Sequence, residues 1–130
     1  METENNLSKH SRGHICEIRM KLPSLNDYIN LCRANRYQSA DFKRQIEKDI
    51  GYYLKPLKRF KKPVRIHFVW IEKDMRRDAD NIAFAKKFIL DAMVKSRKIQ
   101  DDSRRYVTGF TDTFKQGKET KVQIIVTEEE

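Results

Sequence analysis

The fold of this chain is decided by residues 64–96, which read VRIHFVWIEKDMRRDADNIAFAKKFILDAMVKS. The first eight residues alternate with a period of two, which is typical of a strand with one buried face. The side chains expected on that inner face are Val64, Ile66, Phe68 and Trp70. Apolar residues then recur at helical spacing, which predicts a helix that begins near residues 78–81 and ends around Ser96.

A strand and two helices are predicted before this unit. Apolar residues alternate with polar ones from His14 to Leu22, which indicates another half-buried strand, and Pro23 ends it. Residues 24–34 are expected to form a short helix. A longer helix is expected from an N-cap at Ser39 to about Leu54.

Two more strands are predicted after it, at residues 106–111 and 121–127, joined as a hairpin around residues 115–119. The order β-α-α-β-α-β-β predicts a single small α+β domain, a mixed four-stranded sheet with helices packed on one face. We expect residues 1–12 to be a disordered polar tail, residues 13–127 to be the folded domain and residues 128–130 to be an acidic end.

Length and composition bound the class of protein. A chain of 130 residues has room for one modest core. It contains no apolar run of about 20 residues that would span a bilayer, and no apolar stretch of a secretory signal at its start. The two cysteines, Cys16 and Cys32, form no CxxC pair, which argues against a structural zinc site or a disulfide framework. We therefore expect a cytoplasmic protein with no membrane partner and no small-molecule cofactor.

Charge is unevenly distributed along the chain. Residues 51–100 hold 14 of the 28 Lys and Arg residues but only 5 of the 19 Asp and Glu residues, so the whole net charge of +9 lies in this segment. A concentrated basic excess favours binding to a phosphate backbone. The alternative is a well-solvated lysine-rich surface.

The densest basic stretch is KPLKRFKKP, residues 55–63. Its candidate phosphate contacts are Lys58, Arg59, Lys61 and Lys62. Phe60 lies among them, and two interpretations stay open: it stacks on a base, or it packs into the core.

Two acidic clusters flank the predicted central helix. Asp78 and Asp80 form a DxDN motif directly after Arg76 and Arg77, and Asp101-Asp102 follow the helix. Magnesium prefers such hard oxygen ligands and assists phosphodiester hydrolysis. The two arginines would hold the DNA backbone near the carboxylates. This hypothesis requires carboxylates from both ends of the helix to meet at one cation.

A lysine of the same helix is a further candidate. At about 100° per residue, Lys87 shares one stripe with Asp80 and Asp91, whereas Lys86 points away from it. Lys87 is therefore the better candidate for a lysine that stabilises charge on the phosphate, and Lys86 is second.

Each of these residues also has an ordinary structural interpretation. Asp78 or Asp80 would cap the helix N-terminus, and Asp101 and Asp102 would be turn residues. Lys87 and Asp91 would then form a surface ion pair at i,i+4 spacing.

The stretch RRDADNIAFAKKFILDAMVKSRKIQDDSRRYV, residues 76–107, resembles the central signature of the RusA family of Holliday junction resolvases. That signature reads approximately RxDxDN, a helix with an inward lysine, an LDAL-like segment, and DD before a strand. The basic linker and PSLNDYI, residues 23–29, resemble the phage-borne branch, and the resemblance covers roughly residues 14–127.

The resemblance implies a crossover junction endodeoxyribonuclease that depends on Mg²⁺, for which Mn²⁺ can substitute. Such an enzyme is a homodimer that resolves a four-way DNA junction by paired symmetric nicks, in recombination and repair. Its expected place is the cytoplasm of a bacterial or phage-infected cell. The two-fold symmetry of the junction independently favours a pair of copies with one site each.

The family's site residues transfer by position. Asp78 and Asp80 match the paired metal-binding aspartates, and Asp102 matches the essential acid of the DD pair, with Asp101 as its neighbour. Lys87 matches the catalytic lysine when the alignment is anchored at LDAM. The spacing from Asp80 to Asp91 is longer than in shorter members of the family, so the lysine assignment stays between Lys86 and Lys87.

The alternative function is a non-catalytic branched-DNA-binding protein on the same scaffold.

Overall fold

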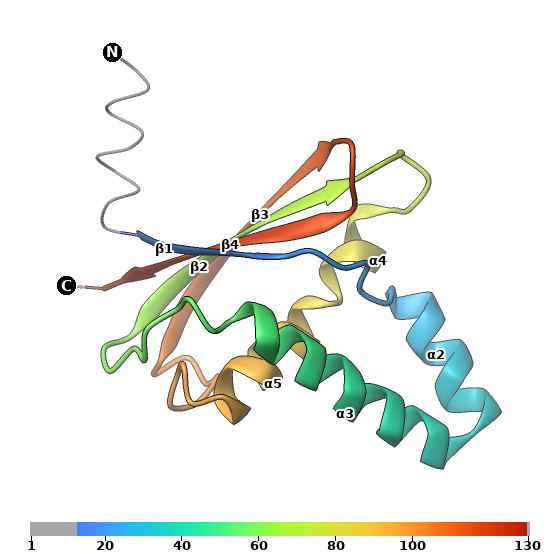
Figure 1. Cartoon of the computed structure of the whole chain (residues 1–130), viewed down its shortest axis with the longest axis horizontal. Coiled ribbons are helices and arrows are strands. Elements are labelled where there is room, and N and C mark those ends of the chain that lie inside the picture. The colour runs from blue at the N-terminus through green and yellow to red at the C-terminus, as the bar shows by residue number, and fades with distance from the viewer. Residues whose placement is uncertain (1–12, 130) are drawn as a thin grey trace.

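Four strands form one mixed sheet in the order β1-β4-β2-β3, as the computed structural model shows for residues 13–129 (Figure 1). The strands are β1 (Gly13–Ile18), β2 (Val64–Glu72), β3 (Val107–Gln116) and β4 (Lys121–Glu128). Strand β2 is parallel to β3 and antiparallel to β4, which is in turn antiparallel to β1. The expected mixed four-stranded sheet is therefore confirmed. The tail expected at residues 1–12 and the last residue of the acidic end, Glu130, lie outside the residues that the structure describes.

The helices lie together on one side of this sheet (Figure 1). They are α2 (Leu25–Ala34), α3 (Arg36–Tyr53), α4 (Ala79–Ala83) and α5 (Lys86–Lys95). The core lies between α3, α5 and the sheet. As the alternation predicts, the inner face of β2 is fully buried, with at most 2% of each side chain exposed at Val64, Ile66, Phe68 and Trp70. Within the described residues, no helix is both long and apolar enough to cross a bilayer.

The predicted hairpin between the last two strands is wrong. Strands β3 and β4 do not pair, because β2 lies between them. The connecting loop crosses the end of β2, where the Gly117 N–H donates to the Glu72 carbonyl at 2.8 Å. Burial explains this strand order. Val122, Ile124 and Val126 of β4 are at most 4% exposed, so the more apolar β4 lies inside the sheet and the more polar β3 lies at its edge.

The start of α3 and the end of β1 also differ from the expectation. The N-cap of α3 is Asn35 and not Ser39, because the Asn35 carboxamide oxygen accepts hydrogen bonds from the N–H groups of Tyr37 and Gln38. Ser39 lies inside the helix. Strand β1 ends at Ile18, although Leu22 is buried as expected.

The central helix is interrupted, although the sequence predicts it as continuous. Helix α4 ends at Ala83, and α5 begins at Lys86. Across the interruption the N–H groups of Ala85, Lys87 and Phe88 bond to carbonyls three residues earlier, the pattern of a tighter 3₁₀ turn. This turn changes the rotation per residue, so the angles projected from Asp80 onto α5 do not hold.

Candidate metal site and nucleic-acid interface

The DxDN motif lies where the chain leaves β2 and enters α4. Asp78 is the N-cap residue of α4, but its side chain makes no capping hydrogen bond. The Asp80 carboxylate accepts a hydrogen bond from the Asn81 N–H at 3.0 Å. Both residues are exposed, and no ion pair within residues 13–129 includes either of them. Both carboxylates therefore keep oxygen atoms available for a cation.

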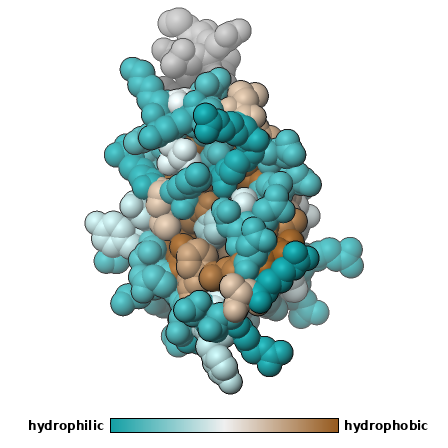
Figure 2. Space-filling model, turned by 90° about the vertical axis from the view of Figure 1, so that its right-hand side faces the viewer, coloured by the Kyte–Doolittle hydropathy of each residue, from teal (hydrophilic) through white to brown (hydrophobic). Residues whose placement is uncertain are grey.

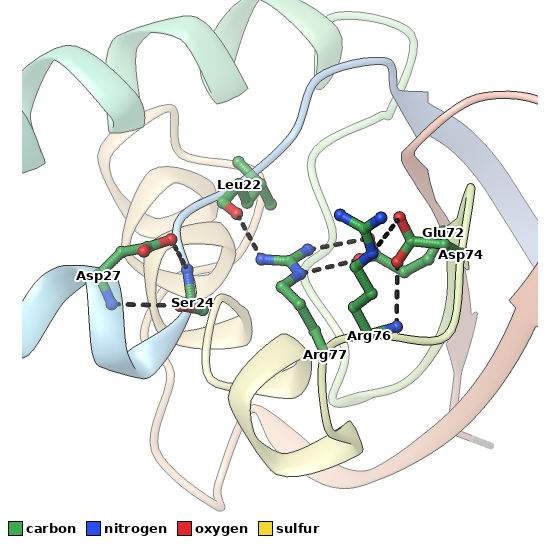
Figure 3. Close-up of polar contacts among 7 residues, drawn as sticks. All are labelled: Leu22, Ser24, Asp27, Glu72, Asp74, Arg76 and Arg77. Atoms are coloured by element: carbon green, nitrogen blue, oxygen red, sulfur yellow. Dashed lines mark hydrogen bonds and ion pairs between the residues drawn. The ribbon is translucent and has the colours of Figure 1, made fainter.

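Arg77 anchors the loop that carries this motif (Figure 3). Its Nε and Nη2 each donate to the Glu72 carboxylate at 2.8 Å, and Nη1 donates to the Leu22 carbonyl at 3.3 Å. The guanidinium is committed to the protein, with 19% of the side chain exposed. Arg77 thus holds the loop of Asp78 against the end of β2 and against the segment before α2. The sequence analysis expected Arg77 to contact DNA, but its guanidinium contacts the protein instead.

The neighbouring Arg76 is placed differently. Its side chain is 89% exposed, and its only ion pair within the described residues is a long one, 3.9 Å from Nε to Asp74. Asp74 also accepts a hydrogen bond from the Arg76 N–H at 3.0 Å (Figure 3). Arg76 is therefore free to contact a phosphate beside Asp78 and Asp80.

Asp101 and Asp102 lie at the opposite end of the molecule from the DxDN motif. They follow α5 and precede β3, whose first residue pairs with Val64 at the start of β2, whereas Asp78 and Asp80 follow the end of β2. The nine residues of β2 separate these ends by about 26 Å. Both are exposed turn residues, and the Asp102 N–H donates to Asp101 at 2.7 Å.

The expectation that carboxylates from both ends of the helix meet is therefore wrong for a single chain. No three His, Cys, Asp or Glu side chains among residues 13–129 are arranged to hold a metal ion. The physical reason is that the α4–α5 segment runs back along the sheet and carries the two acidic pairs to opposite ends. Asp78 and Asp80 remain together, and Asp102 does not join them.

The two candidate lysines point in directions opposite to those expected from a continuous helix, which had placed Lys87 toward the site and Lys86 away from it. The side chain of Lys86 reaches the edge of the sheet, where Nζ donates to Asp112 at 2.7 Å and lies 4.7 Å from the ring centre of Phe110. Lys87 is 60% exposed and lies 3.7 Å from Asp91, the i,i+4 pair of the structural interpretation. Lys86 is thus the inward-facing lysine of the pair.

Asp112 is the residue that sequence reasoning missed. One of its oxygens accepts from Lys86 and the other from the Trp70 indole N–H at 2.8 Å, which joins α5 to two neighbouring strands. The expected strand stopped at Thr111, so Asp112 fell in a turn. Its alternation with Phe110 and Phe114 was the available signal that β3 continues.

The basic linker divides into paired and free residues. Lys58 forms an ion pair with Glu128. Arg59, Lys61 and Lys62 are exposed, and none has an ion pair within the part of the chain that the structure describes. Phe60 is 5% exposed and packs against His14 with ring centres 5.1 Å apart, so it belongs to the core.

An apolar pocket of about 390 Å³ lies beside the DxDN motif. Trp70 and Ile82 contribute buried side chains to its lining, and Phe114 and Met75 contribute exposed ones. Figure 2 views the molecule from the end where α4 lies and shows apolar surface framed by hydrophilic side chains. The candidate metal ligands are thus bordered by an uncovered apolar surface.

No protein-family model matches this chain, and no curated protein matches it either.

Proposed function

We propose that this chain is a metal-dependent, structure-selective endodeoxyribonuclease that resolves four-way DNA junctions by paired symmetric nicks. The observation that carries the proposal is the anchored DxDN loop: Asp78 and Asp80 are exposed and free of ion pairs, and Arg77 fixes the loop beneath them. The resemblance of residues 76–107 to the RusA signature supports the same assignment.

The donor set fits a magnesium ion. Mg²⁺ is usually bound through one or two carboxylates together with waters and substrate phosphates, and Asp78 and Asp80 supply such a pair. When bound, the ion would polarise the scissile phosphodiester and stabilise the leaving oxygen. Arg76 would hold the adjacent phosphate, and the free cations of the basic linker, Arg59, Lys61 and Lys62, would bind the DNA backbone farther along.

The position of Asp102 gives the proposed homodimer a structural role. Because Asp102 lies at the far end of the sheet from Asp78 and Asp80, it reaches a site of this type only from a second copy. A symmetric pair of copies would then hold two such sites, one for each strand to be cut.

A junction-cleavage assay tests the proposed function. Synthetic four-way junctions are incubated with Mg²⁺, with Mn²⁺ and with a chelator, and we expect symmetric nicks only when a metal is present. Asp80→Asn should abolish cutting while the protein stays folded and still binds the junction. Asp41→Asn is the matched control, because it removes the same charge from an exposed position on α3. Undiminished cutting by folded Asp80→Asn would refute the assignment.

A second candidate is a non-catalytic branched-DNA-binding protein on the same scaffold. The absence of a three-carboxylate group within residues 13–129 of one chain favours it. In that case the junction is bound equally well with metal and with chelator, and the wild-type protein cuts under neither condition.

A further inference from the structure

Two cavities of different chemistry share the ion pair between Glu72 and Arg77. One is the apolar pocket of about 390 Å³ beside the DxDN motif. The other, of about 450 Å³, is called the cationic cavity here. Glu72, Asp74 and Arg77 line both, so the loop after β2 separates one cavity from the other. The hydrogen bonds from Arg77 to Glu72 hold this loop in place (Figure 3).

Basic side chains predominate in the lining of the cationic cavity. Three acidic residues line it beside five basic ones, which come from the segments after β1 and β2: Arg19, Lys21, Lys73, Arg76 and Arg77. Two of the acids are already paired, because Glu72 is held by Arg77 and Glu119 has a lysine 3.4 Å away. Lys21 and Lys73 are exposed and form no ion pair among residues 13–129. The cavity therefore suits a phosphate group.

The apolar pocket suits one flat ring. Its volume lies within the range of about 300–1,000 Å³ that is usual for small-molecule sites. Trp70 and Ile82 form its buried part, and Phe114, in register with Trp70, is 41% exposed and offers an aromatic surface for stacking. The Gln116 carboxamide N–H donates to the Lys73 carbonyl at 3.0 Å, which leaves its oxygen for a donor on the ring.

We propose that the apolar pocket receives one unstacked nucleobase of the DNA strand to be cut, and that the cationic cavity binds a phosphate of the same strand. A nucleotide joins a flat, largely apolar ring to an anion, and the two cavities offer the matching surfaces side by side. Ala79 lines the apolar pocket between Asp78 and Asp80 in sequence, so a base held there lies next to the candidate metal ligands. The inference rests on the proposed function and names the part of the junction that its site recognises.

A pocket of this kind favours junctions over duplex DNA. In a duplex each base is stacked and paired, and removing it costs free energy that is smallest where the base is already unpaired or unstacked. The branch point of a junction interrupts both stacking and pairing. A base from the branch point therefore enters the apolar pocket at a lower cost than a base from a duplex arm.

An apolar side chain of a protein partner is the competing occupant. It would fill the apolar pocket, but it would leave Lys21 and Lys73 in the neighbouring cavity without an anion. A nucleotide satisfies both cavities, so the charge favours DNA.

Fluorescence locates the base. 2-Aminopurine, a fluorescent base analogue, is placed in turn at each position near the branch point of a synthetic junction, with a chelator present so that no strand is cut. Addition of the wild-type protein should raise the fluorescence at one position of each of two opposing strands, because the analogue leaves the stack there. An analogue in a duplex arm should not respond.

Removal of either partner of the stack tests the pocket. Phe114→Ala should weaken binding of the intact junction by about 5- to 150-fold, the range for loss of one base–aromatic stack. It should not weaken binding of a junction that is abasic at the responsive position. Phe110→Ala is the matched control, because Phe110 lies on the same face of β3 with 43% exposure but does not line the pocket. Phe114→Trp keeps an aromatic ring and should restore the fluorescence response, and circular dichroism checks that each variant is folded.

Salt dependence tests the cationic cavity. The double variant Lys21→Ala with Lys73→Ala should reduce the slope of the logarithm of the binding constant against the logarithm of salt concentration by about two. Arg36→Ala with Lys48→Ala is the matched control, since it removes two exposed cations of α3 that have no ion pair in the described part of the chain. That control should leave the slope unchanged, and an equal change in both double variants contradicts a phosphate site in the cavity.

The outcomes separate this inference from the proposed function. If Phe114→Ala weakens binding of intact and abasic junctions equally at every position, the base pocket is overturned even when the protein cuts DNA. A change in sedimentation coefficient caused by Phe114→Ala also overturns it, because the pocket then belongs to a contact between copies. Coupling between Phe114 and one base, in a protein that cuts with neither Mg²⁺ nor Mn²⁺, supports the pocket and refutes the nuclease.

Discussion

At the scale of single residues, two adjacent arginines have separate roles. Both precede the DxDN motif in sequence, yet Arg77 is held by Glu72 and Leu22 while Arg76 is exposed. The sequence placed the two cations correctly beside the carboxylates. It did not reveal which one the protein itself uses, because the partners of Arg77 lie 5 and 55 positions away along the chain.

Substituting these arginines one at a time should separate folding from DNA binding. Arg77→Ala leaves Glu72 without its bidentate partner and should lower the free energy of unfolding by about 2 kcal/mol, measured by urea denaturation. Arg76→Ala should leave stability unchanged and weaken junction binding. It should also reduce the slope of the logarithm of the binding constant against the logarithm of salt concentration by about one. Equal stability of the two variants would contradict the anchoring role of Arg77.

Glu17 makes the stability of the sheet depend on pH. A hydrogen bond from Gln123 and further ones from Lys121 and Arg19 lower the pKa of Glu17 below its usual value of 4.5. A carboxyl whose pKa is lower in the folded state stabilises the fold above the unfolded-state pKa, and this contribution is lost as the pH falls through the folded-state pKa. Stability should therefore decrease below about pH 4.5.

The variant Glu17→Gln should flatten that acid dependence, as measured by denaturation midpoints between neutral pH and pH 3. Gln123→Ala removes the principal cause of the shift and should reduce the same slope. Because the two residues contact each other, the double variant should show less than the sum of the single effects. Additive effects would show that the contact does not set the pKa.

At the scale of elements, burial and local hydrogen bonds decided what the sequence pattern left open. The period of two identified the inner face of β2 correctly, but it did not say which strand lies next to which. The order of β3 and β4 follows from the loop that crosses the end of β2. Likewise, apolar residues keep their helical spacing through Phe84 and Ala85, so the apolar pattern does not predict the turn between α4 and α5.

Two glycines give a paired test of this element geometry. A Cβ on Gly117, in the crossing loop, would lie 2.6 Å from Cγ2 of Ile71, so Gly117→Ala should destabilise the fold by about 1–3 kcal/mol. Gly51 lies inside α3, and apart from its two chain neighbours and the nearby backbone of that helix no heavy atom lies within 4 Å of its added Cβ, so Gly51→Ala should stabilise by about 0.5–1 kcal/mol. Thermal denaturation measures both, and shifts of the same sign would contradict the packing described for the loop.

At the scale of the whole molecule, the two acidic motifs that lie near each other in sequence are found at opposite ends of the sheet. The DxDN and DD motifs lie about twenty residues apart in sequence, a distance that one helix spans, and their resemblance to one signature favours one site. The length of the predicted helix, about 25 Å for residues 80–96 at 1.5 Å per residue, already indicates that the two motifs lie far apart. The sequence does not show that this segment lies along β2 and leaves the motifs at opposite ends of that strand. The candidate residues are thus predictable from the sequence as a set, but one chain does not bring them together within residues 13–129.

Mixing inactive variants should show whether one site draws on two copies. Asp80→Asn and Asp102→Asn should each be inactive alone. In a dimer of the proposed kind, Asp80 and Asp102 of one site come from different copies, so in a mixed dimer one site carries both substitutions and the other carries neither. Subunit exchange should therefore restore metal-dependent nicking of one strand, seen on a junction with one labelled arm. Mixing Asp80→Asn with Asp78→Asn is the matched control and should restore nothing, since these two carboxylates belong to the same copy in each site. If the first mixture stays as inactive as its components while subunit exchange is demonstrated, Asp102 does not act across the dimer.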